Sequence, residues 1–398
     1  MTFALAHSLP FLDFGAPGFS TRGPEVLFAR EKSWCARTPF GLAVLRHREA
    51  GQLLRDRRLR QGSYAWPEIM GLKGSFAEFW TRSIIGQEGE VHKAQRRLAQ
   101  DALSSEIVTG LVPHFEETAK ILANELVEND CCEFIGDFSH PFAGRAVTTI
   151  LGLPASEADW IASDAVSLGL AMGLDCKRHE AEFNAACDQL TDLARDLLAR
   201  AQRQDPGENF VSRLVAGAKV LPIDEQVLLD LIVITIFGGV DTTRAQLGIA
   251  MALFCDHPDQ WQMLRGHPDL IPQAIEEAIR TRPTTTWSTR EAVEDFEFNG
   301  AQIKAGETVH FLAHATGTDP LAVPGWKFDI TAPRKVHFGF GGGAHHCLGQ
   351  FVARTDMAAA LRVLTRRFKH VAYGGTPRWL PETGNTAPAH LPLRLTPA

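Results

Sequence analysis

The chain has 398 residues, of which 45% are hydrophobic and 22% charged, as is ordinary for a globular protein with a large apolar core. Its formal net charge of -7 gives no indication of a nucleic-acid partner. Seven cysteines without a C-x-x-C pair argue against a disulfide framework or a structural zinc site, and favour a reducing compartment.

The N-terminus and the most apolar run indicate neither export nor a membrane. Residues 1–14 lack a basic region ahead of an apolar stretch, so they do not resemble a secretory signal. Residues 228–240 are interrupted by Asp230 and are too short to span a bilayer. No internal repeat, low-complexity segment or linker stands out. We therefore expect a cytoplasmic protein with no membrane contact, folded as a single domain over residues 1–398.

The first half of the chain reads as helical. Apolar residues such as Leu98, Ala102 and Ile107 recur at helical spacing within residues 86–129. Residues 140–204 also look helical, with breaks at Pro154 and near Gly173. The sequence Asp-Pro-Gly at 205–207 predicts a turn.

A long helix over residues 224–255 is the clearest single element. Pro222 and Asp224 fit its start, and His257-Pro258 follows its end. Residues 228–237 are apolar almost all round, so this helix should lie buried in the middle of the fold. A second helix is expected over 268–281, stopping before Pro283.

The pattern then changes to short strands and a glycine-rich loop. Residues 296–298 and 301–303, joined by Asn299-Gly300, predict a hairpin. Glycines between 339 and 343 lead into a last helix, expected over residues 347–368. The whole reads as mainly α with small β-sheets.

The loop before the last helix carries the chemistry. A metal-binding cysteine must be a thiolate, and a helix N-terminus favours that anion at Cys347. Glycines ahead of it let the backbone approach a flat ligand, and Gly349 removes a side chain that would collide with one. A mobile loop with Cys347 as a small core residue is the alternative. Zinc is disfavoured because His345, His346 and Cys347 are adjacent and lack tetrahedral spacing.

This loop resembles the haem-binding signature of the cytochrome P450 family, F-G-x-G-x-H-x-C-x-G. The matching residues are Phe340, Gly341, Gly343, His345, Cys347 and Gly349. The resemblance implies a triangular, α-rich prism that encloses haem b (iron protoporphyrin IX). It also implies that Cys347 is the axial iron ligand, that Phe340 shields its sulfur and that His345 contacts a haem propionate.

The buried long helix carries a second match. Gly238-Gly239 is followed by Asp241 and Thr242, and paired glycines inside a helix cost about 1 kcal/mol each against alanine. In isolation, a helix kink with a satisfied Asp241 explains the segment equally well. The segment resembles the family's oxygen-binding groove, [AG]-G-x-[DE]-T. There a kink makes room for dioxygen, and Asp241 with Thr242 would deliver protons as the catalytic pair.

Glu277 and Arg280 form a third match. An acid and a base three residues apart are commonly a solvated pair on a helix surface. Here they resemble the family's E-x-x-R, a structural pair that braces the haem-binding core. Ala332 stands where the usual third partner, an arginine, is expected, and Arg334 lies two residues on as a possible substitute.

Further propionate contacts follow from the same resemblance. His92 and Arg96 match H-x-x-x-R, although a charged surface helix would look the same, as Lys93 and Arg97 suggest. Arg290 occupies a position that often supplies another propionate partner. His337, three residues before Phe340, is a weaker candidate.

The resemblance also implies a pocket rich in aromatic and aliphatic side chains. Residues 61–90 are expected to cover it, and Arg82 within them could meet a substrate carboxylate. The candidate pocket residues are Trp66, Phe79, Ile234, Phe237, Gly238, Thr284 and Trp287.

These matches predict a haem-thiolate monooxygenase that inserts one oxygen atom of O2 into an apolar or aromatic small organic substrate. No flavin or iron–sulfur domain is encoded, so electrons should come from a separate ferredoxin and ferredoxin reductase. Arg96, Arg97 and Lys93 are candidate contacts for an acidic ferredoxin on the face nearest Cys347. The alternatives are a peroxide-driven peroxygenase, which tends to lack the acid–alcohol pair, and a haem sensor or carrier without enzymatic activity.

Overall fold

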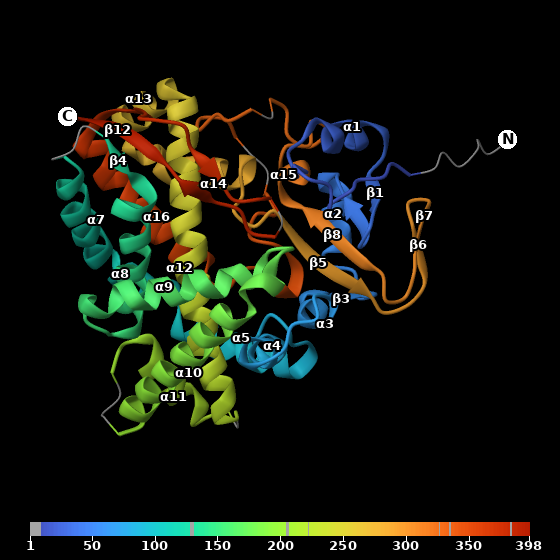
Figure 1. Ribbon diagram of the computed structural model, residues 1–398, viewed down its shortest axis with the longest axis horizontal. Coiled ribbons are helices and arrows are strands. Elements are labelled where there is room, and N and C mark those ends of the chain that lie inside the picture. Colours follow the sequence, from blue (N-terminus) through green and yellow to red (C-terminus); the bar gives the residue numbers. More distant parts are fainter. Residues whose placement is uncertain are drawn as a thin grey trace.

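The computed structural model describes residues 9–127, 131–203, 207–221, 223–325, 327–333, 336–382 and 384–398. Helices dominate this part of the chain (Figure 1). The α-helices are α1 (Pro24–Lys32), α2 (His47–Leu53), α3 (Trp66–Ile69), α4 (Ser75–Arg82), α5 (Gly89–Ala102), α6 (Ser105–Gly110), α7 (Val112–Leu126), α8 (His140–Leu151), α9 (Ala158–Gly169), α10 (Glu180–Arg203), α11 (Phe210–Ala218), α12 (Glu225–Asp256), α13 (Pro258–Gly266), α14 (Ile271–Thr281), α15 (Ala313–Gly317) and α16 (Gln350–Arg367).

Short strands make up small sheets. The strands are β1 (Cys35–Thr38), β2 (Gly41–Val44), β3 (Leu59–Gln61), β4 (Cys132–Glu133), β5 (Trp287–Ala292), β6 (Phe296–Phe298), β7 (Ala301–Ile303), β8 (Thr308–Leu312), β9 (Phe368–Tyr373), β10 (Arg378–Trp379), β11 (Pro388–His390) and β12 (Pro392–Pro397). One sheet has the order β1-β2-β8-β5-β3, in which β2 and β8 are parallel and the other neighbours antiparallel. This sheet lies beside the helical part, with α1 and α2 next to it (Figure 1).

Helix α12 runs through the middle of the helical part, as its apolar sequence predicts (Figure 1). The Asp224 side chain caps it by accepting a hydrogen bond from the Gln226 N–H at 2.8 Å. Pro222, the other predicted start signal, lies outside the described residues. By length and composition α12 would be able to cross a membrane. However, 67% of its most apolar window is buried inside the protein, which identifies it as a core helix.

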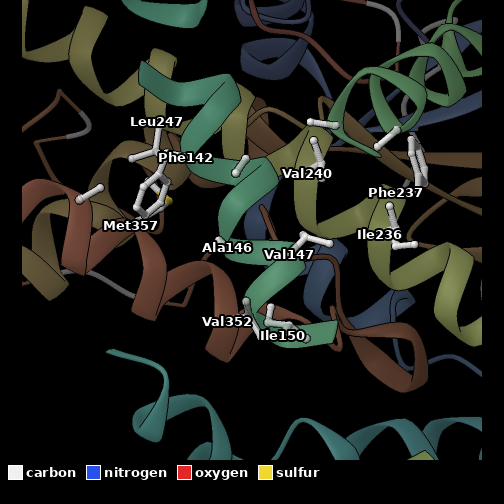
Figure 2. Close-up of a cluster of buried hydrophobic side chains, with 14 of the residues drawn as sticks. Phe142, Ala146, Val147, Ile150, Ile236, Phe237, Val240, Leu247, Val352 and Met357 are labelled. Atoms are coloured by element: carbon white, nitrogen blue, oxygen red, sulfur yellow. The ribbon is translucent and has the colours of Figure 1, made fainter. Parts of the chain in front are cut away.

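The core around α12 is built by helices from distant parts of the sequence. Figure 2 shows parts of one buried cluster: Phe142, Ala146, Val147 and Ile150 come from α8, Ile236, Phe237, Val240 and Leu247 from α12, and Val352 and Met357 from α16. Helices α9 and α10 pack on α12 as well. Helix α12 is therefore packed against other helices on several sides.

The expected helical regions exist, with breaks that the periodicity alone did not place. Residues 86–129 contain α5, α6 and α7, and residues 140–203 contain α8, α9 and α10. Helix α8 ends at Leu151, and the Gly152 that follows it has a left-handed φ of 73°, two residues before Pro154. Of the turn predicted at 205–207, the first two residues lie outside the described part of the chain.

The C-terminal elements confirm two predictions and correct one. Strands β6 and β7 form the expected hairpin, and Asn299 and Gly300 both have the positive φ (45° and 80°) of a type I′ turn. The helix expected over 268–281 starts with a 3-10 turn, and its α-helical part is α14.

The last helix begins at Gln350 and not at Cys347 as predicted. The reason is that the Cys347 N–H bonds back to the Phe340 carbonyl at 2.9 Å, which keeps the cysteine inside the loop.

Candidate active site

The glycine-rich loop presents Cys347 just ahead of α16. Gly341 and Gly343 have φ of 67° and 68°, a conformation that other residues rarely adopt. A side chain at Gly343 would overlap the carbonyl oxygen of Leu54 at the end of α2. Glycine therefore lets the loop pack closely against α2, which fixes the position of the cysteine that follows.

The surroundings of Cys347 have opposing effects on the pKa of its thiol. Burial raises its pKa above the ordinary value, whereas the backbone N–H groups of Gly349 and Gln350 and the charges of Arg96 and Arg354 act to lower it. These donors and cations surround the sulfur at the N-terminal end of α16. They are the groups that would stabilise a thiolate once a metal ion replaces the thiol proton.

A charged cluster supports Phe340 beside the cysteine. The Arg354 guanidinium lies 4.5 Å from the centroid of the Phe340 ring and pairs with Glu276 at 2.6 Å. His337 Nε2 lies 3.2 Å from Glu276, and His337 Nδ1 accepts a hydrogen bond from the Gly339 N–H. These contacts lower the pKa of Glu276 to about 2 although burial acts in the opposite direction. His337, the weaker propionate candidate, thus has a carboxylate of the protein as its partner.

The predicted propionate contacts gather in one place. His92 and His345 stack with ring centroids 4.0 Å apart, and the His345 Nε2 lies 3.1 Å from the Glu88 carboxylate. Arg290 of β5 is buried and donates to the Gly342 carbonyl at 2.8 Å. Arg96 of α5 donates to the His346 carbonyl at 2.7 Å. Glu88, which immediately precedes α5, was not anticipated from the sequence.

The electrostatic properties of this group of predicted propionate contacts favour the binding of an anion. Burial lowers the pKa of Arg290 to about 10, and Glu88 is the acidic side chain that acts in the other direction. Burial and the neighbouring His92 lower the pKa of His345 to about 4. The His92 Nε2 is buried and has no hydrogen-bond partner among the described residues. Because buried polar atoms are normally paired, this atom points to a ligand.

Haem fits these observations. A side chain at Gly349 would have only the Cys347 sulfur within 4 Å, at 4.0 Å, and one at Gly238 of α12 would meet nothing within 4 Å. Cys347 would hold the iron, and His92, Arg96 and Arg290 would hold the anionic propionates. Among the described residues no group of three or more His, Cys, Asp or Glu side chains lies close enough together to hold a metal ion. When bound, a thiolate-ligated haem iron supplies the chemistry of oxygen activation.

Helix α12 carries the predicted catalytic pair. It continues as one helix through Gly238 and Gly239, so the space at Gly238 arises from its missing side chain. The Thr242 hydroxyl donates to the Gly238 carbonyl one turn earlier. Asp241 is buried and forms an ion pair with Arg244 at 2.9 Å. Arg244 follows Asp241 by three residues, a spacing that would have revealed this partner in the sequence.

The Glu277–Arg280 pair is buried, with side chains only 1% exposed, and is bidentate at 2.6 and 2.7 Å. Arg280 also donates to the Gly317 carbonyl, and Glu277 accepts the Asp329 N–H. The pair therefore joins α14 to the segment that leads toward the cysteine loop. It is not the solvated surface pair of the alternative interpretation. Arg334, the possible third partner, lies outside the described residues.

The candidate pocket residues are distributed over several elements. Phe79 and Phe237 are buried, and Phe237 makes an edge contact with Trp80 at 6.5 Å between ring centroids. Ile234 is half-buried on α12, and Trp66 donates to the Ala171 carbonyl at 2.7 Å.

Two other candidates make different contacts. The Thr284 hydroxyl donates to the Thr386 carbonyl, and Trp287 stacks on Phe14 with centroids 5.2 Å apart. The guanidinium group of Arg82, which was expected to be able to meet a substrate carboxylate, pairs with the Asp230 carboxylate of α12 at 3.1 Å.

Comparisons with known proteins identify the family. Residues 172–392 match the sequence profile described as cytochrome P450. The chain is 35% identical over 393 residues to luteothin monooxygenase of Streptomyces thioluteus, covering 97% of this chain and 96% of that protein. The structure matches P450BioI in complex with hexadec-9Z-enoic acid ligated acyl carrier protein (TM-score 0.84, 25% identity, 93% and 97% covered).

A further neighbour, epothilone B-bound cytochrome P450epoK, has a TM-score of 0.87 at 19% identity and covers 97% of this chain and 99% of that one. At this identity the match shows the fold alone. It agrees with the mainly α architecture and small sheets described above. With its cysteine loop, its acid–alcohol pair and these relatives, the chain belongs to the cytochrome P450 family and is a haem b monooxygenase.

Proposed function

We propose that this enzyme inserts one oxygen atom of O2 into an apolar or aromatic small organic molecule. The observation that carries the proposal is the similarity to luteothin monooxygenase along 97% of the chain. We also propose that residues 1–398 fold as one domain that works in the cytoplasm, with electrons from a separate ferredoxin and ferredoxin reductase.

The residues expected around the substrate support an apolar ligand. Phe79 and Phe237 offer aromatic surface, and Ile234 adds an aliphatic side chain on the same helix as Phe237. The charge of Arg82 is balanced by Asp230, whose side chain is only 5% exposed. We therefore expect shape and apolar contact, and not an ion pair, to hold the substrate.

Asp241 and Thr242 are proposed to deliver protons during the reaction. A buried carboxylate is costly unless it is paired, and Arg244 supplies a pairing charge at 2.9 Å. The Thr242 hydroxyl is held by the Gly238 carbonyl, so its oxygen can accept a hydrogen bond from the side of the open space at Gly238. Asp241 would take protons from solvent, and Thr242 would keep an ordered water in position.

The face behind the cysteine loop is proposed to bind the ferredoxin. A groove of about 830 Å³, lined in part by Phe340, His346 and Arg354, opens on this face. Phe351 is 51% exposed, and a smaller hollow that it lines includes Cys347 and Arg96. An exposed aromatic side chain beside cations suits an acidic redox protein.

The three predicted docking cations differ in their surroundings. Arg97 and Lys93 are exposed on α5, although Lys93 pairs with Glu90 at 2.6 Å. Arg96 turns inward to the His346 carbonyl and so belongs to the cysteine loop and not to the docking surface. Arg97 is thus the strongest candidate of the three.

Docking is tested with Arg97→Glu. We expect a higher KM for ferredoxin and a weaker dependence of turnover on ionic strength, because one attractive charge becomes repulsive. Lys304→Glu is the matched control, since Lys304 lies beside the hairpin β6–β7, which projects from the edge of the molecule (Figure 1). Equal responses in both variants would rule out this docking site.

The reaction itself is tested with a small-molecule library. Binding is followed by the spectral change that accompanies displacement of the iron's water ligand, and each binder is then incubated with ferredoxin, reductase and isotopically labelled O2. Product that carries one labelled oxygen atom supports the proposal. Product formed only with hydrogen peroxide would identify a peroxygenase, and binding without any product would favour a sensor or carrier.

A further inference from the structure

The carboxylate of Asp241 has a different partner on each oxygen. Arg244, on the same helix, donates to Oδ1 at 2.9 Å. Asn385, in the loop between β10 and β11, donates through Nδ2 to Oδ2 at 3.5 Å. The first contact is short and charge-assisted, whereas the second joins a neutral amide at the outer limit of hydrogen bonding.

A second contact fixes which end of the Asn385 amide faces Asp241. The Thr285 hydroxyl lies 3.1 Å from the Asn385 Oδ1 and donates to it. Because the amide oxygen is engaged there, the NH2 group is the end that faces the carboxylate. Thr285 and Asn385 are also joined by an isolated backbone bridge. The side chain of Asn385 therefore spans from the segment before β5 to the catalytic acid on α12.

The loop that carries Asn385 is anchored on both sides of this residue. Glu382 accepts hydrogen bonds from the hydroxyls of Ser20 and Thr21 at 2.7 and 2.9 Å. The Thr386 N–H donates to the Thr284 carbonyl at 2.7 Å, and this backbone bond holds the loop directly after Asn385. The Asn385 amide is consequently held in place by its neighbours and does not depend on Asp241 for its position.

Gly169, the last residue of α9, lies close to the Asp241 carboxylate on another side. A side chain at this glycine would lie 3.3 Å from the Asp241 Cγ, which is closer than ordinary contacts allow. Helix α9, helix α12 and the Asn385 loop thus surround one carboxyl group. Such an enclosure leaves little freedom for rotation about the Cβ–Cγ bond of Asp241.

We propose that Asn385 is a positioning residue that orients Asp241 for proton transfer through its Oδ2. The charge-assisted bond from Arg244 disfavours a proton on Oδ1, so the oxygen with the weaker partner is the one that accepts it. A proton arriving from solvent adds to Oδ2 while the long Asn385 contact lengthens or yields, and the contact re-forms when the proton leaves. This inference rests on the proposed role of Asp241 in proton supply.

The test uses Asn385→Ala and Asn385→Asp in the haem-loaded enzyme. Thr386→Val is the matched control, because it removes a neighbouring hydroxyl bond of the same loop without touching Asp241. NADH consumption is measured in H2O and D2O with a ferredoxin, an NADH-dependent ferredoxin reductase and styrene as the aromatic probe. Asp241→Asn is measured in parallel as the reference for lost proton supply.

Asn385→Ala should slow NADH consumption about 2- to 10-fold, the range expected for one neutral hydrogen bond. It should also raise the solvent isotope effect above the wild-type value. Asn385→Asp should be slower still, because it places a second carboxylate against Asp241. Thr386→Val should retain the wild-type rate and isotope effect.

An infrared measurement that does not require turnover accompanies the kinetic experiments. The antisymmetric carboxylate stretch of Asp241, assigned in the infrared spectrum of the resting protein by its loss in Asp241→Asn, should shift in Asn385→Ala and not in Thr386→Val. Wild-type values in Asn385→Ala, or equal changes in Asn385→Ala and Thr386→Val, would overturn the positioning role. An unchanged isotope effect in Asp241→Asn would overturn the proposed proton role of Asp241 and this inference with it.

Discussion

His92→Phe offers a sharp test of the haem cradle because it affects two states of the protein in opposite directions. The His92 Nε2 is buried without a partner among the described residues, whereas its ring stacks on His345 at 4.0 Å. Phenylalanine preserves the ring and removes the nitrogen. In the apoprotein the change should be neutral or stabilising by about 1–3 kcal/mol, since an unsatisfied buried donor is lost.

In the haem-loaded protein the same change removes a charge-assisted hydrogen bond to a propionate. Such a bond contributes about 1.5–3 kcal/mol, so haem should leave about 10- to 100-fold faster. Haem transfer to excess apomyoglobin measures this rate, and urea unfolding measures the stability of the apoprotein.

Trp261→Phe serves as the control for His92→Phe, because the Trp261 Nε1 of α13 is also a buried nitrogen without a partner among the described residues. Haem loss at the wild-type rate in His92→Phe, or equal acceleration in both variants, would refute the reasoning.

Further predictions concern the catalytic pair, pH and the core. Thr242→Ala should keep consuming NADH while releasing hydrogen peroxide in place of product, and Asp241→Asn should turn over slowly with less effect on product per electron; NADH, peroxide and product are quantified together. Burial holds the pKa of His310 at about 4, so the unfolded state binds more protons below about pH 6.5. Stability should therefore be complete above pH 6.5 and fall by about 2 kcal/mol at pH 5 on account of this residue, a loss that His310→Gln should remove from urea unfolding curves. Phe142→Ala, in the core of Figure 2, should lower the free energy of unfolding by about 3–5 kcal/mol.

Elements with strong local signals were predictable from the sequence. The apolar run of α12, its Asp224 cap and the Asn299-Gly300 turn each specify their structure within a few residues. The start of α16 was misplaced, because the bond from the Cys347 N–H to the Phe340 carbonyl depends on how the whole loop folds back. The spacing of apolar residues in the sequence carries no information about such a hydrogen bond between the two ends of a loop.

The site was predictable where its residues lie in short motifs. Cys347 and Asp241 are predicted as site residues from their neighbours in sequence. Glu88 and Asn385 are not, because each reaches its partner only through tertiary contacts: Asn385 lies 144 positions from Asp241. Trp287 is the opposite case. Its aromatic side chain suggested a place in the substrate pocket, and in the structure its ring packs on Phe14.

The central claim, that the thiolate of Cys347 ligates haem iron, is tested most directly by the absorption spectrum of the reduced carbonyl complex. The wild-type protein should show the red-shifted Soret band of thiolate ligation, because a charged sulfur donates electron density to the iron. Cys347→Ala should lose that band together with all oxygenation. A normal thiolate-type band in Cys347→Ala would contradict the account.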